Sequence, residues 1–75
     1  MSFPGRSIDE LVRIAEAGAG FRLDGAARPM HDLVRIAGAA SPWGVRLVFA
    51  GMDDRSTGDL VRIATAGEGT AEFEG

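Results

Sequence analysis

The 75-residue sequence contains no cysteine, so neither a disulfide nor a thiolate metal site can support the fold. It also lacks lysine, asparagine, glutamine and tyrosine, and all eight of its basic residues are arginine. This composition is typical of a GC-rich bacterial coding sequence. It also leaves open a second interpretation, in which arginine is used to bind anions with its planar, two-pronged side chain.

Long apolar runs and excess positive charge are absent too. No apolar run approaches the roughly 20 residues of a membrane span, and Met1–Gly5 lacks the basic and apolar regions of a signal peptide. The net charge of −3 argues against a general nucleic-acid binder. We therefore expect a cytoplasmic protein that binds neither nucleic acid nor membrane. A chain this short has a marginal core, for which oligomerisation is a usual remedy.

A repeated pentapeptide organises the chain. Leu-Val-Arg-Ile-Ala occurs at Leu11–Ala15, Leu33–Ala37 and Leu60–Ala64, and an acidic residue precedes each copy. The copies are 22 and 27 residues apart. A repeat of this period is typical of stacked supersecondary units. We predict units at 7–25, 29–51 and 56–75, which together form one domain over residues 7–75 after a loose lead-in at 1–6.

Each unit opens with a predicted amphipathic helix. Ser7 and Glu10 have the spacing of a capping box, and Gly18 and Gly67 are expected to end the first and third helices. Apolar residues recur three and four positions apart, which predicts one buried face per helix. We expect these faces to be Ile8, Leu11, Val12 and Ala15; Met30, Leu33, Val34 and Ala37; and Thr57, Leu60, Val61 and Ala64. The three leucines should be almost fully buried.

Each unit closes with a predicted strand, where apolar and polar residues alternate. Strands joined through helices are parallel with right-handed crossovers, which puts the helices on one face of a three-stranded sheet. Two columns of residues should face the helices, namely Phe21, Leu47 and Ala71, and Leu23, Phe49 and Phe73. The opposite face should carry Arg22, Asp24, Arg46, Val48, Ala50, Thr70, Glu72 and Glu74. The predicted class is α/β, with three tandem helix–strand repeats.

Over Ser7–Gly75 these short helix–strand repeats with one parallel sheet resemble leucine-rich-repeat solenoids. The chain departs from that pattern because it has no L-x-L-x-x-N strand signature and no asparagine to build the asparagine ladder. The resemblance implies a solenoid-like domain that binds other proteins.

No residue pattern identifies a catalytic centre, and we predict no catalytic, cofactor-binding or metal-binding residue. The glycines at Gly18/Gly20 and Gly67/Gly69 follow helices, whereas a phosphate loop precedes one. An alternative function is a small ligand- or metal-dependent enzyme at the edge where the strands end. That edge holds Asp24, His31, Asp53, Asp54 and Arg55.

Two further features have two interpretations each. Arg13, Arg35 and Arg62 form a row that either binds an acidic partner or is solvated and paired with acids in its own helices. Trp43 lies in a turn and either covers the end of the core or contacts a partner.

The bare sheet face suggests a non-enzymatic protein-interaction or self-assembly module. Parallel sheets are seldom uncovered on one face, so we expect a homodimer or higher assembly, and possibly another protein partner. Arg22 of one chain could pair with Glu72 or Glu74 of another across a two-fold axis. The expected contact residues are Trp43, Arg46, Val48, Ala50, Arg22 and Glu72.

Overall fold

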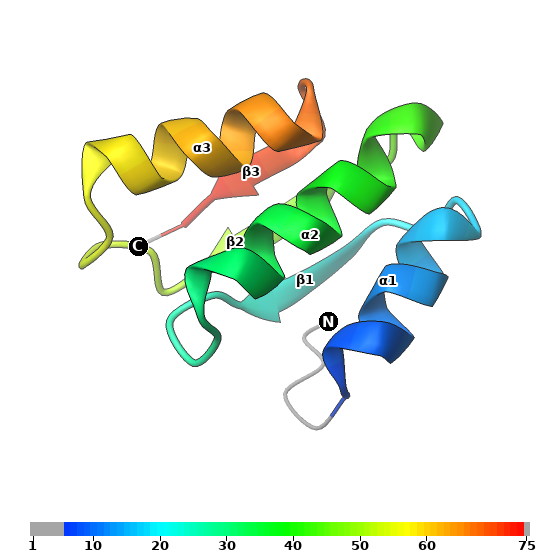
Figure 1. Cartoon of the computed structure of the whole chain (residues 1–75), viewed down its shortest axis with the longest axis horizontal. Coiled ribbons are helices and arrows are strands. Elements are labelled where there is room, and N and C mark those ends of the chain that lie inside the picture. The colour runs from blue at the N-terminus through cyan, green and yellow to red at the C-terminus, as the bar shows by residue number, and fades with distance from the viewer. Residues whose placement is uncertain (1–5, 75) are drawn as a thin grey trace.

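The computed structural model describes residues 6–74, in which three helices alternate with three strands (Figure 1). The elements are α1 (Ile8–Glu16), β1 (Phe21–Asp24), α2 (Met30–Ala40), the short 3-10 turn η1 (Ser41–Trp43), β2 (Leu47–Ala50), α3 (Thr57–Gly67) and β3 (Ala71–Phe73). The predicted α/β class and the predicted order of elements are confirmed. The expectations for residues 1–5 and for Gly75 lie outside the described residues.

The strands form a parallel sheet in the order β1-β2-β3, and the three helices lie side by side over one of its faces (Figure 1). The register pairs Phe21 with Leu47 and Leu47 with Ala71, as the alternation of apolar residues predicts. On the helix-facing side Leu47 and Phe49 are completely buried. The Phe49 ring lies 6.0 Å from that of Phe73, measured between centroids.

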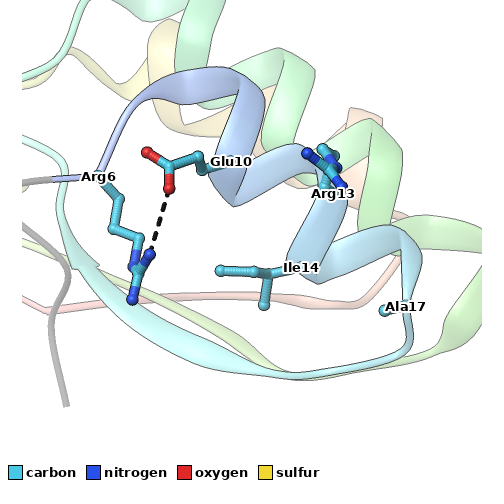
Figure 2. Close-up of a pocket in the computed structure, with 5 residues that line it drawn as sticks. All are labelled: Arg6, Glu10, Arg13, Ile14 and Ala17. Atoms are coloured by element: carbon cyan, nitrogen blue, oxygen red, sulfur yellow. Dashed lines mark hydrogen bonds and ion pairs between the residues drawn. The ribbon is translucent and has the colours of Figure 1, made fainter.

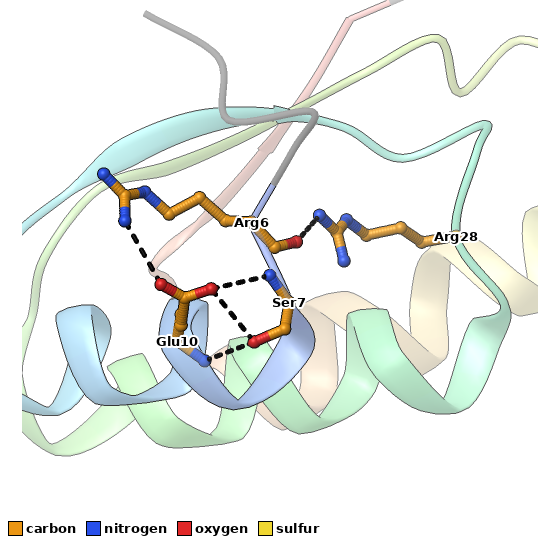
Figure 3. Close-up of polar contacts among 4 residues, drawn as sticks. All are labelled: Arg6, Ser7, Glu10 and Arg28. Carbon is orange, nitrogen blue, oxygen red and sulfur yellow. Dashed lines mark hydrogen bonds and ion pairs between the residues drawn. The ribbon is translucent and has the colours of Figure 1, made fainter.

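The start of α1 is fixed by a polar network (Figure 3). The Ser7 hydroxyl accepts a hydrogen bond from the Glu10 backbone N–H at 3.2 Å, and the Glu10 carboxylate accepts one from the Ser7 backbone N–H at 3.2 Å. This is the predicted capping box. Arg6 pairs with the same carboxylate at 3.2 Å, and Arg28 donates to the Arg6 carbonyl at 2.6 Å. The Ser7 backbone N–H, and then Arg6, lower the pKa of Glu10 below its ordinary value.

The three copies of the pentapeptide are buried differently, which the sequence did not predict. In α1 the leucine, the valine and the alanine are buried; in α2 the leucine, the isoleucine and the alanine; in α3 only the isoleucine, Ile63. The predicted face of α3 is therefore wrong. Three of its members are exposed, namely Thr57, Val61 and Ala64, and Leu60 is only half-buried.

The position of each helix in the row explains this difference. Helix α2 packs against both α1 and α3, whereas within residues 6–74 each outer helix packs mainly against α2. Helix α3 turns its Ile63 flank towards α2, so Val61 on its other flank has no helix beside it and is 56% exposed. Helix α1 shows the reverse, because Val12 is 9% exposed while Ile14 is half-buried.

Helix α3 ends at Gly67 as predicted, but Gly67 is not the left-handed residue that caps it. The left-handed residues after the helix are Glu68, with φ of 50°, and Gly69, with φ of 95°. Gly67 instead occupies a tight contact, because a Cβ atom there would lie 2.8 Å from the Thr70 hydroxyl oxygen and 3.5 Å from the Ala37 Cβ atom. The missing side chain lets the end of α3 approach α2 and the start of β3.

Candidate interaction surface

The sheet face that no helix covers holds the predicted contact residues. Cross-strand register places Arg22, Val48 and Glu72 side by side, and places Asp24 beside Ala50. Their neighbours along each strand point to the helices and are buried, so these rows lie on the opposite face. With Arg46, which pairs with Glu72, the structure thus brings together five of the six predicted contact residues, Arg22, Arg46, Val48, Ala50 and Glu72.

Two ion pairs cross this open sheet face. The Arg22 guanidinium (Nη2) lies 2.7 Å from the Glu74 carboxylate (Oε1), which joins β1 to the residue after β3 across the central strand. Arg46, just before β2, pairs with Glu72 on β3 through Nη2 and Oε1 at 2.9 Å. That pairing with Glu72 raises the pKa of Arg46 above its ordinary value.

The open side of the central strand is apolar. Val48 and Ala50 are half-buried although no helix lies over them. Strands β1 and β3 flank this apolar strip on both sides, and the paired arginines and glutamates border it. The surface is therefore a small apolar centre framed by two opposite-sign pairs, with all four charged side chains still accessible to solvent.

Arg22 does not depend on a second molecule for a partner. We expected it to pair with Glu72 or Glu74 of another chain, and in the structure it pairs with Glu74 of its own chain. Glu74 was expected only as a possible partner in another chain and was not one of the six predicted contact residues. The signal was present in the sequence, because Glu72 and Glu74 are two residues apart and so share one face of an extended chain.

Trp43 lies outside the three strands. It ends η1, four residues before β2 begins, and its side chain is 57% exposed. The interpretation of Trp43 as a cover of the core is therefore wrong. The alternative, that it contacts a partner, stays a prediction.

The edge where the strands end is organised by loop contacts. Asp24 accepts a hydrogen bond from the Ala26 backbone N–H at 3.0 Å, which is a local turn contact. Arg55 donates to the carbonyls of Gly25, at 2.8 Å, and of Arg28, and so ties the loop before α3 to the loop before α2. Within residues 6–74 no three acidic or histidine side chains come together as a possible metal site.

The remaining predicted features of the helical surface are exposed. His31 lies 3.2 Å from the Asp32 carboxylate with 83% of its side chain exposed. Arg35 pairs at 2.9 Å with Asp9 of the neighbouring helix α1, whereas the sequence suggested an acid of its own helix. This pair bridges two successive repeats.

Comparisons with known proteins add no relative. No family model matches the chain, and no match was found among curated proteins or solved structures. In the part of the chain that the structure describes, no helix has the length and apolar character needed to cross a bilayer.

Proposed function

We propose that this protein is a small, non-enzymatic interaction module of the cytoplasm that associates with protein, including further copies of itself. The observation that carries the proposal is the parallel sheet, which has helices on only one face within residues 6–74. Purely parallel sheets usually have both faces covered, because their strands are apolar on both sides. Here a second chain supplies the cover.

The open sheet face has the composition of a modest interface. Its centre is aliphatic, with Val48 and Ala50 half-buried, and its rim carries the two ion pairs. Such a rim sets orientation and association rate more than affinity. A second copy would place its own Val48 against this centre, and its charges could exchange partners with those of the first copy about a two-fold axis.

The test is sedimentation of wild type and Val48→Asp at matched concentrations. The new carboxylate would put a charge into the apolar centre of the interface and would compete with Glu74 for Arg22, which lies beside residue 48. The average mass should therefore fall towards that of the monomer. Val48→Thr keeps the branched shape and serves as a milder second variant if Val48→Asp folds poorly, as judged by circular dichroism. His31→Asp adds the same charge on the helical side and should leave the mass unchanged.

The results separate the proposal from its alternative. Wild type that stays monomeric up to about 1 mM, a range that covers weak association, would overturn self-association. A higher melting temperature on adding a divalent metal would favour the ligand-dependent enzyme, because a ligand that binds only the folded state stabilises it.

A further inference from the structure

The two ends of the repeat array expose complementary halves of one packing contact. Inside the array, the valine flank of a helix faces the next helix, and the isoleucine flank faces the helix before it. Thus Val12 of α1 and Ile36 of α2 are both buried, and so is Ile63 of α3. In the part of the chain that the structure describes, no helix lies beside the isoleucine flank of the first helix or the valine flank of the last.

The free flank of α1 is a groove of about 330 Å³, lined by Arg6, Glu10, Arg13, Ile14 and Ala17. Figure 2 shows Ile14 projecting from α1 into the space beside the Arg6–Glu10 pair. Four of the five lining residues recur in both later units with the same character: an acid, an arginine, an isoleucine and an alanine. Their equivalents are Asp32, Arg35, Ile36 and Ala39 in α2, and Asp59, Arg62, Ile63 and Ala66 in α3.

Burial shows what occupies this flank elsewhere. Ile36 and Ile63 are completely buried by the packing of the array, whereas Ile14 is half-buried and Ala17 is exposed. The local sequence is the same in each case, so only the missing neighbour distinguishes α1. Among residues 6–74 no helix fills the groove, which is equivalent to a contact that the chain makes twice with itself.

The opposite end carries the matching surface. Val61 of α3 is equivalent to Val12, which is buried where α1 meets α2. Ala64 is likewise exposed, although its equivalents Ala15 and Ala37 are completely buried. The end of the array thus presents the surface that would fill the α1 groove.

We infer that the α1 groove binds the Val61 flank of α3 in a second copy of this chain, so that copies stack end to end and continue the array. The inference rests on the proposed self-association, but it uses a surface other than the open sheet face. Repetition of the internal geometry would place β3 of one copy beside β1 of the next. A contact of this head-to-tail kind is open-ended, so each copy can bind one more at either end.

The decisive experiment mixes two variants. Ile14→Asp places a charge only in the α1 groove, and Val61→Asp places one only on the α3 flank. Each variant therefore lacks one half of the contact and should not stack by itself. In a mixture, the intact α3 flank of the first variant meets the intact groove of the second. Sedimentation from about 10 μM to about 1 mM, a range chosen for weak association, should show a higher average mass for the mixture than for either variant alone.

The mixture distinguishes this contact from a two-fold contact through the open sheet face. Association through that face alone would leave each variant assembled as in wild type, and mixing would change nothing. That result would overturn the end-to-end inference and leave the proposed function standing. A mass that responds to mixing but not to Val48→Asp would support end-to-end stacking and refute the sheet-face contact.

One replacement variant and one control complete the experiment. Ile14 is half-buried, so Ala17→Arg, at an exposed position of the same groove, replaces Ile14→Asp if that variant unfolds. His31→Asp adds a negative charge on exposed α2 surface and should stack like wild type.

A substitution at Gly58 should strengthen stacking, because the Arg35–Asp9 ion pair between α2 and α1 has no equivalent at the contact between two copies. Arg35 of α2 pairs with Asp9 of α1, and the equivalent residues across the end contact are Arg13 and Gly58. A Cβ atom at Gly58 would meet only the Ser56 hydroxyl oxygen within 4 Å, at 3.9 Å. Gly58→Asp should tighten stacking about two- to five-fold, as expected for an exposed pair. Gly58→Asn should not, and equal effects of the two would count against the inference.

Discussion

Valine-to-alanine substitutions at the three equivalent helix positions test whether α1, α2 and α3 bury different sides of the same pentapeptide. Val12, Val34 and Val61 sit in identical pentapeptides, so intrinsic helix propensity changes by the same amount at each site. They differ in burial: Val12 is 9% exposed, Val34 is half-buried and Val61 is 56% exposed. Differences between the three variants therefore report tertiary packing alone.

The expected costs follow from this exposure. Removing two fully buried methylene equivalents costs about 1.6 kcal/mol, and the higher helix propensity of alanine offsets about 0.5 kcal/mol at each site. Val12→Ala should lower the free energy of unfolding by about 1 kcal/mol or slightly more, since a cavity adds to the loss. Val61→Ala should change it by less than about 0.3 kcal/mol. Val34→Ala should fall between the two.

Thermal and urea unfolding followed by circular dichroism measure these differences. A change of 1 kcal/mol moves the melting temperature of a domain this size by about 4–8 °C. The samples should be dilute, so that association does not contribute to stability. If Val12→Ala and Val61→Ala lowered the free energy of unfolding equally in dilute solution, the exposed position of Val61 on α3 would be refuted.

The remaining predictions concern one close backbone approach and one titrating cap. Gly20→Ala should destabilise the fold by about 1–3 kcal/mol, because the new Cβ atom would lie 2.4 Å from the Arg46 carbonyl oxygen. Its control is Gly38→Ala, where nothing lies within 4 Å and thermal unfolding should show a gain of about 0.5–1 kcal/mol. The lowered pKa of Glu10 predicts stability that is present above about pH 4.3, its unfolded value, and lost as the pH falls through the folded value. Glu10→Gln keeps a capping-box side chain, so its urea midpoint should vary less with pH below that value than the midpoint of wild type does.

Much of the fold could be predicted from local patterns. The alternation around Phe21, Leu47 and Ala71 specified both the strands and their register, because a shift of one residue would turn every apolar side chain away from the helices. The capping box at Ser7 could also be predicted, since both of its residues lie within one helical turn.

The errors arose where burial depends on position in the array. The sequence around Val61 is the same as that around Val12, so no local pattern could tell that one faces a helix and the other faces solvent. The partner of Arg22 likewise depends on a strand some fifty residues away, and both Glu72 and Glu74 lie on the right face. The alternation of residues therefore predicted which side chains share the open sheet face, but the ion-pair partners depend on the tertiary structure.

The central place of α2 and β2 has a consequence for how the chain folds. Within residues 6–74, the main helix–helix and strand–strand contacts between units all involve the middle unit. In such a one-dimensional array, stability is a sum of unit and nearest-neighbour terms, and folding spreads from a nucleus to its neighbours. From a nucleus in the middle unit, folding can spread to both outer units at once, whereas folding that begins in an outer unit reaches the other outer unit only after the middle unit has folded. The order of events during folding should therefore run from the centre outwards, with both ends the first to open.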